Sequence, residues 1–144
     1  MNKGITIVFL FLTSVAFGQL DVNWRELSDV TFEDKYLPDL DAYHWYPTFG
    51  EKVVALEGEE IAITGYVIPV DYESNYYILS ANPYASCFFC GNAGPETVVE
   101  LELKEEDDSY TTDQRLTFKG ILRLNTDDIY KMNYILEEAE VYDY

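Results

Sequence analysis

Apolar and polar positions alternate along much of the chain after residue 59, and this pattern predicts β-strands. The clearest segment is Glu60–Val70, where both alternate sets of positions are largely apolar, so we expect this strand to be covered on both faces at its far end. Four further segments have the composition of strands: Tyr76–Ala81, Thr97–Leu103, Arg115–Leu124 and Met132–Tyr142. The last contains Glu137–Glu140, which favours helix, but the aromatic residues around it favour a strand.

Two of the predicted strands have a glycine near the middle, Gly65 and Gly120. A central glycine is typical of a bulge or a sharp bend, as at the corner of a barrel. Several strands joined by hairpin-length turns therefore predict a mainly β fold. We expect a small OB-like (oligonucleotide/oligosaccharide-binding) Greek-key barrel of five or six strands with one short helix. A flatter two-sheet sandwich is the alternative.

The segment before the barrel is polar and aromatic and has no clear helical period. We expect residues 19–46 to form an N-terminal extension. Within it, Val30–Phe32 and Lys35–Leu37 predict a first strand, and Pro38 should end that strand because proline cannot donate to a strand ladder.

The barrel domain is expected to cover residues 47–144 and to open with the short helix over Pro47–Leu56. Proline is tolerated in a first helical turn, and Phe49, Val53 and Leu56 are spaced to share one face.

The N-terminus has the pattern of an export signal. Lys3 precedes the apolar run Ile5–Phe17, which has the length of a signal-peptide core and is too short to span a bilayer comfortably. Small residues predict cleavage after Gly18, so residues 1–18 are expected to be a signal peptide. No cysteine follows the cleavage point, so we expect no lipid anchor. The mature chain is predicted to be exported, in the periplasm or secreted, with no membrane span.

Composition narrows the classes of partner. The chain has 144 residues, 48% of them hydrophobic, and a formal net charge of -18. This length suits one domain, and the apolar fraction suits a folded core. Phosphate binding needs clustered Lys and Arg, so this charge argues against a nucleic-acid partner and against anionic membranes.

Both cysteines lie in one motif, Cys87-Phe88-Phe89-Cys90, within a loop rich in Gly, Pro and Asn. Three interpretations stay open: a local disulfide or buried thiols, a redox pair, and half of a metal site. A redox pair needs its first thiol at a helix N-terminus, and the glycines and proline of residues 91–95 disfavour a helix there.

Paired thiolates suit zinc, which usually takes four ligands in proteins. The chain has one histidine, His44. Together with Cys87, Cys90 and one carboxylate, for which Glu96 is the candidate, it would complete a tetrahedral zinc site.

The sequence resembles small exported bacterial proteins of uncharacterised function, a domain-of-unknown-function family. The resemblance covers roughly Trp24 to Val141. Its most specific part is the CFFCG-x-x-GPE block within Cys87–Leu101. The other matching segments are the W-x-x-L element of Trp24 and Leu27, the G-Y-x-x-P core within Thr64–Pro69, Lys119–Asn125 and Tyr134–Leu136.

The resemblance implies an accessory role near export or metal-uptake transporter components. Members of the wider family often have a single cysteine followed by histidine, so a ligand set does not transfer intact to Cys87 and Cys90. We expect a non-enzymatic binding protein that handles zinc through this loop, with a transporter component or another exported protein as partner. The alternative is an interaction module in which Phe88 and Phe89 are exposed anchors and the cysteines form a staple. A thiol-disulfide enzyme is the third hypothesis.

Overall fold

The computed structural model describes residues 20–87, 93–107 and 109–143. The predicted signal peptide lies outside these residues. Among them, no helix has the length and apolar composition that crossing a membrane requires.

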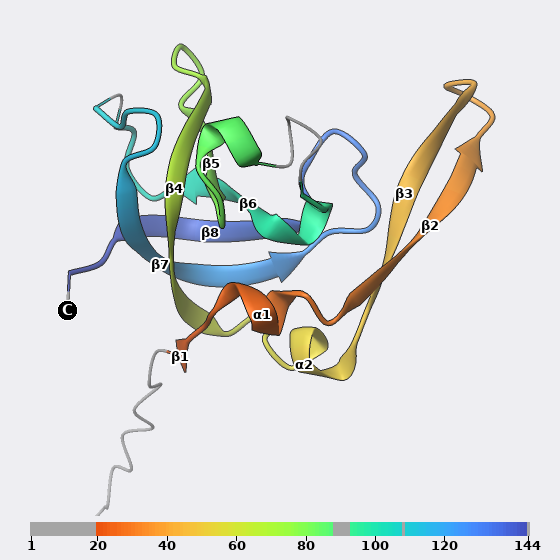
Figure 1. Cartoon of the computed structure of the whole chain (residues 1–144), viewed down its shortest axis with the longest axis horizontal. Helices are drawn as coiled ribbons and strands as arrows, with labels where there is room; N and C mark the ends of the chain where they lie inside the picture. The colour runs from red at the N-terminus through yellow and green to blue at the C-terminus, as the bar shows by residue number, and fades with distance from the viewer. Residues whose placement is uncertain (1–19, 88–92, 108, 144) are drawn as a thin grey trace, which may run out of the picture.

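Five strands close into a barrel, which confirms the predicted OB-like fold (Figure 1). Around the barrel the order is β4, β5, β6, β8, β7, and β7 pairs back onto β4. All neighbouring pairs are antiparallel except β6 and β8, which are parallel. This order and these directions are those of the five-stranded Greek-key OB barrel. The strands are β4 (Glu60–Asp71), β5 (Tyr76–Ser80), β6 (Val98–Leu103), β7 (Arg115–Leu124) and β8 (Tyr134–Val141).

The barrel interior is filled by the apolar sets that the sequence pattern identified. Ile61, Ile63 and Val67 of β4 are all almost completely buried, as expected for its inward face. Tyr77 and Tyr134 are the largest fully buried side chains. The segment with helix-favouring glutamates forms strand β8, because its apolar side chains pack in the core while its glutamates stay nearer the surface.

The two central glycines allow close strand contacts, but only one accompanies a bulge. At Gly120, a Cβ atom would lie 2.5 Å from the carbonyl oxygen of Glu137. The register of β7 with β8 shifts at this point, and Glu138 of β8 has a φ of 52°. At Gly65 the register is continuous, and the glycine is needed because a Cβ would lie 2.6 Å from the carbonyl oxygen of Ser80.

The N-terminal segment closes one end of the barrel. Its short strand β1 (Leu20–Asp21) runs parallel to β4, and α1 (Trp24–Leu27) follows. The Trp24 indole N–H donates to the Thr64 carbonyl oxygen at 2.8 Å, and the Tyr134 hydroxyl donates to the Leu27 carbonyl oxygen at 2.6 Å. The W-x-x-L element therefore attaches the segment to the barrel.

The helix expected over Pro47–Leu56 is shorter than predicted. It is α2 (Glu51–Val54), and it is one of two short α-helices rather than a single helix. It begins at Glu51 because the carboxylate of Asp29 accepts a hydrogen bond from the Lys52 backbone N–H at 3.0 Å and so caps its first turn from a distance.

A β-hairpin projects from the barrel and was only half predicted (Figure 1). Strand β2 (Val30–Leu37) matches the expected first strand, with Pro38 just beyond its end. Strand β3 (Ala42–Phe49) was not predicted, and it crosses the boundary expected at residue 46. The two strands form a two-stranded antiparallel sheet with a continuous register. We refer to residues 30–49 as the arm.

Candidate functional site

The cysteine loop is described only at its two ends. Cys87 follows the short 3-10 turn η1 (Tyr84–Ser86), and its side chain is a free thiol that is completely buried. This departs from the disulfide interpretation and agrees with a buried thiol. Cys90, Phe88 and Phe89 lie outside the described residues, so their predicted roles as ligand and anchors stay predictions.

The other two predicted zinc ligands lie in different grooves. Glu96, in the 3-10 turn η3 (Pro95–Thr97), lines a groove with Trp45 of the arm. His44 lines a second groove, with Thr126 and Asp127 of the β7–β8 loop. Across residues 20–87, 93–107 and 109–143, no three His, Cys, Asp or Glu side chains are grouped so that they could hold a metal ion. The described residues therefore do not bring the predicted ligand set together.

Strand alternation gives the arm two different faces. Residues that are paired across the hairpin, such as Tyr36 with Tyr43 and Asp34 with Trp45, point to the same side. One face therefore carries most of the aromatic and apolar side chains: Val30, Phe32, Tyr36, Tyr43, Trp45, Pro47 and Phe49. We call this the aromatic face. The opposite face is more polar: Thr31, Glu33, Lys35, Leu37, Ala42, His44, Tyr46 and Thr48.

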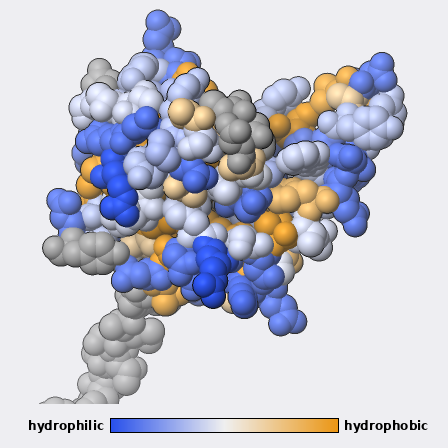
Figure 2. Space-filling model, in the orientation of Figure 1, coloured by the Kyte–Doolittle hydropathy of each residue, from blue (hydrophilic) through white to orange (hydrophobic). Residues whose placement is uncertain are grey.

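The aromatic face is open to solvent along much of its length. Tyr43 is 73% exposed, Trp45 52% and Tyr36 46%. The rings contact each other across the hairpin in tilted arrangements, with centroids 5.3 Å apart for Tyr36 and Tyr43 and 6.3 Å apart for Phe32 and Trp45. Hydrophobic residues are visible on the surface of the projecting arm in Figure 2. Such a patch, outside the core, is typical of a contact surface.

A hydrogen bond orders the tip of this face. The Tyr36 hydroxyl donates to a carboxylate oxygen of Asp41 at 2.5 Å. This bond raises the pKa of Tyr36, since loss of the proton would place two negative charges side by side. Asp41 has a φ of 47°, so a residue that tolerates left-handed backbone closes the turn between β2 and β3.

The base of the aromatic face forms an open groove with the segment that leaves the cysteine loop. The arm contributes Phe32, Asp34 and Trp45, and the turn at η3 contributes Pro95 and Glu96. Gly94 completes the lining. The groove therefore combines two aromatic rings with two carboxylates, and it places the end of the cysteine loop beside the arm.

The more polar face of the arm meets the β7–β8 loop instead. Lys35, His44 and Tyr46 line a groove with Thr126 and Asp127 of that loop. The Lys35 ammonium lies 4.5 Å from the centroid of the Tyr46 ring, which is a cation–π contact. His44 and Trp45 are neighbours in sequence but belong to opposite faces of the arm.

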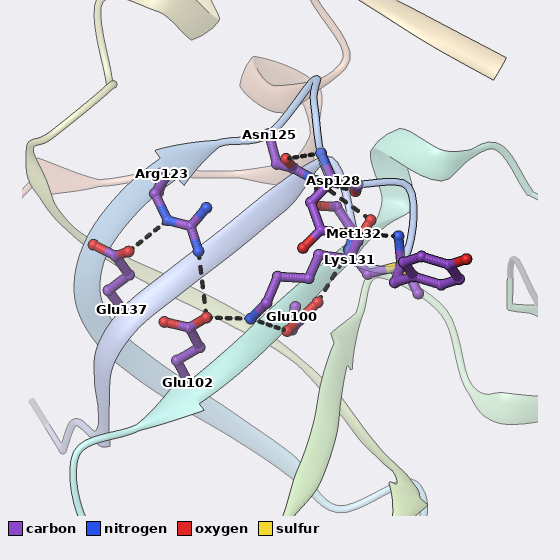
Figure 3. A network of polar contacts seen from close by, with 9 residues as sticks. Glu100, Glu102, Arg123, Asn125, Asp128, Lys131, Met132 and Glu137 are labelled. Carbon is purple, nitrogen blue, oxygen red and sulfur yellow. Dashed lines mark hydrogen bonds and ion pairs between the residues drawn. The ribbon is translucent and has the colours of Figure 1, made fainter. Parts of the chain in front are cut away.

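A network of charged side chains clamps the start of β8 to β6 and β7 (Figure 3). Lys131 pairs with Glu100 at 3.1 Å and with Glu102 at 2.5 Å, and Arg123 bridges Glu102 and Glu137. The hydrogen bond that the Lys131 ammonium donates to Glu102 raises the pKa of Lys131 more than burial lowers it. Because the network pairs each of these charges, we interpret it as a structural clamp of the β7–β8 loop.

Sequence reasoning predicted the first strand of the arm but missed the second strand, and with it the hairpin that forms this candidate surface. The signal was present as alternation on both sides of a turn: Phe32, Asp34 and Tyr36 before Pro38, then Tyr43 and Trp45 after it. Equal spacing on either side of a Pro-Asp turn predicts a hairpin.

A comparison with solved structures found a protein with a similar fold. A crystal structure of a DUF3299 family protein from Pseudomonas aeruginosa PAO1 superposes with a TM-score of 0.54 and 15% sequence identity, over 88% of this chain and 98% of that one. Neither the family models nor the curated proteins give a match. At this identity the likeness shows the fold alone. It agrees with an uncharacterised domain family, as the sequence resemblance implied, and assigns no activity.

Proposed function

We propose that this protein is an exported, non-enzymatic binding module that docks a partner protein on the aromatic face of the arm. The observation that carries the proposal is the exposure of Tyr36, Tyr43 and Trp45 on one face of a hairpin that stands clear of the barrel. Tyrosine and tryptophan are the residues most often found at the energetic centres of protein interfaces.

The arrangement of the arm supports docking over a purely structural role. Large aromatic side chains normally gain stability by leaving water, and these three do so only in part. The groove at the base joins the arm to the end of the cysteine loop, so the loop whose sequence contains Phe88 and Phe89 ends beside the same surface. Export is supported by the signal-peptide pattern described above, and a redox enzyme is disfavoured by the glycines and proline of residues 91–95.

Site-specific crosslinking tests the docking surface. A photo-crosslinking amino acid replaces Tyr43 on the arm or, as a control, Tyr130, which is 81% exposed on the β7–β8 loop. In the cells that naturally produce the protein, we expect one discrete adduct from position 43 and none of the same mass from position 130. Mass spectrometry then identifies the partner.

The purified partner gives the decisive measurement. Trp45→Ala should weaken its binding by about thirtyfold, as loss of an interface centre does. Tyr130→Ala should leave binding unchanged. If Trp45→Ala binds the partner as tightly as the native protein, the aromatic face is not the docking surface.

Zinc handling is the second candidate, and the observation that favours it is the free thiol of Cys87. A thiolate is a strong zinc ligand, and Cys90 would be the second. The test is the zinc content of the mature protein, purified without a metal-affinity tag and then loaded with zinc. We expect about one ion per chain, lost in Cys87→Ser, and less than about a tenth of an ion per chain would exclude this function.

A further inference from the structure

We propose that the partner places an arginine side chain in the groove formed by Phe32, Trp45, Asp34 and Glu96. The inference rests on the proposed function, because it names the chemistry of the partner at that same surface. The occupant is a positively charged peptide segment that runs along the aromatic face of the arm.

The lining of the groove matches a guanidinium group. Phe32 and Trp45 contribute aromatic rings to the lining, and the centroids of the two rings lie 6.3 Å apart. Asp34 and Glu96 offer carboxylates, one from the arm and one from the η3 turn. Arginine stacks on aromatic faces and donates in a fork that fits carboxylates, so one side chain satisfies both parts of the lining.

Among the residues that the structure describes, no lysine or arginine lines this groove. Neither Asp34 nor Glu96 forms an ion pair with a lysine or arginine of the part of the chain that the structure describes. None of the described lysines or arginines lies over the Trp45 ring. With a formal net charge of -18, the chain as a whole also attracts a basic segment.

On the opposite face of the arm, an aromatic ring is already in contact with a cation. There the chain supplies its own cation, since Lys35 covers the Tyr46 ring at 4.5 Å. The aromatic face has equivalent rings and nearby carboxylates without the cation. The difference between the two faces is what points to a cation from outside.

Binding of a tri-arginine peptide tests the inference directly. Trp45 is half exposed, whereas the other tryptophan, Trp24, donates its indole N–H to the barrel, so the two indole N–H signals report different sites by NMR. We expect tri-arginine to shift the Trp45 signal and leave that of Trp24 in place. Tri-citrulline, which has nearly the same shape and no charge, should not bind.

A matched pair of variants separates the groove from general attraction to an acidic protein. Asp34→Asn with Glu96→Gln should weaken tri-arginine binding about tenfold, through loss of the charge-assisted contacts. Glu33→Gln with Asp39→Asn removes the same charge from the arm but outside the groove, and should weaken binding by less than about twofold. Equal effects of the two pairs would overturn the inference, as would equal binding of tri-citrulline.

The remaining outcomes distinguish this inference from the proposed function. If the identified partner is lost in Trp45→Ala but binds normally to the Asp34→Asn, Glu96→Gln variant, the docking surface stands and the arginine occupant is wrong. If Trp45→Ala keeps the partner, the proposed function itself fails. A free polyamine is the other cation of this kind, and spermidine that binds at least as tightly as tri-arginine would overturn the peptide occupant.

Discussion

Asn125 is expected to hold the β7–β8 loop in place, so its removal should destabilise the protein more than its size suggests. The residue is 6% exposed. Its side-chain amide donates to the carbonyl oxygens of Asp128, Met132 and Lys131 at 2.7, 3.2 and 3.4 Å. Its side-chain oxygen accepts from the backbone N–H groups of Asp127 and Asp128 at 3.3 and 3.1 Å (Figure 3). One side chain thus forms hydrogen bonds with backbone groups of the loop, as a neighbouring strand does in a sheet.

The number of bonds sets the magnitude for Asn125→Ala. The side-chain amide donates through its two N–H groups, and its oxygen accepts two further hydrogen bonds. Each hydrogen bond contributes about 1 kcal/mol net to the free energy of unfolding. Complete loss would therefore cost about 4 kcal/mol, and water reaching the loop would recover part of it, so we expect a loss of about 2–4 kcal/mol. Urea denaturation of the native protein and the variant measures this difference.

Asn133→Ala is the matched control within the same loop. The Asn133 side chain donates one bond, to the carbonyl oxygen of Asn125 at 3.2 Å. Its loss should cost about 1 kcal/mol. If Asn125→Ala costs no more than Asn133→Ala, the loop is not organised by the Asn125 side chain. Faster hydrogen exchange at the amides of Asp127 and Asp128 in Asn125→Ala would locate the change in the loop.

Three further predictions concern the barrel and the arm. Gly120→Ala should lower the free energy of unfolding by about 1–3 kcal/mol in urea denaturation, because its Cβ would meet the Glu137 backbone oxygen at 2.5 Å. Gly58→Ala should lower it only by the roughly 1–2 kcal/mol that a left-handed backbone costs, because position 58 has a φ of 77° and no atom within 4 Å of the added Cβ. An unchanged free energy of unfolding in Gly120→Ala, with an unchanged m-value, would contradict the crowding at Gly120. Burial raises the pKa of Tyr134, so the folded state keeps a proton that the unfolded chain loses above its ordinary pKa of 10.0. The free energy of unfolding should therefore fall as pH rises past that value, by up to about 1.4 kcal/mol per pH unit. In urea denaturation at alkaline pH, Tyr134→Phe should show a shallower fall than the native protein. Trp24→Ala should lower the melting temperature markedly and Trp45→Ala very little, because Trp24 packs on the barrel core and Trp45 is half exposed; equal losses in calorimetry would mean that the arm contributes to folding.

The barrel could be predicted from sequence because its strands bury side chains in a regular pattern. In Arg115–Leu124 the apolar positions face the core at alternate residues, so the period of two is visible in the sequence, and in Glu60–Asp71 an almost continuous apolar run matches a strand with buried side chains on both faces. The arm lacks that advantage, since it has no core of its own. Its alternation is between aromatic and charged residues, and Pro47 suggested the start of a helix instead.

Hydrogen-bond alternation explains why Pro47 fits a strand. The Gly50 N–H donates to the Asp29 carbonyl oxygen at 2.7 Å, so this pair is of the hydrogen-bonded type at the base of the hairpin. Pairs alternate along an antiparallel ladder, and Pro47 with Phe32 is three pairs further on. That pair is of the type without mutual bonds, so the position needs no N–H.

The candidate ligand set illustrates what sequence spacing leaves open. His44 was predicted to share a zinc site with Glu96, yet a strand turns each successive side chain to the other face, so His44 and Trp45 line different grooves, and Glu96 lines the groove of Trp45. Cys87 proved to be buried, which a two-residue spacing between cysteines does not indicate. The groove with Glu96 depends on a contact between residues some sixty positions apart, and no local pattern encodes it.

The attachment of the arm explains how a two-stranded sheet can act as a docking surface. A lone hairpin is marginally stable in water, so its aromatic face would need to be ordered at each binding event. Here Asp29 fixes the base: its carbonyl oxygen accepts from Gly50, and its carboxylate caps α2 through the N–H of Lys52. A Cβ at position 50 would lie 2.4 Å or less from this carboxylate, which accounts for the glycine. Because Leu27 and Val53 of the two short helices are fully buried, the base of the arm is joined to the core, and the orientation of the aromatic face is set before a partner arrives.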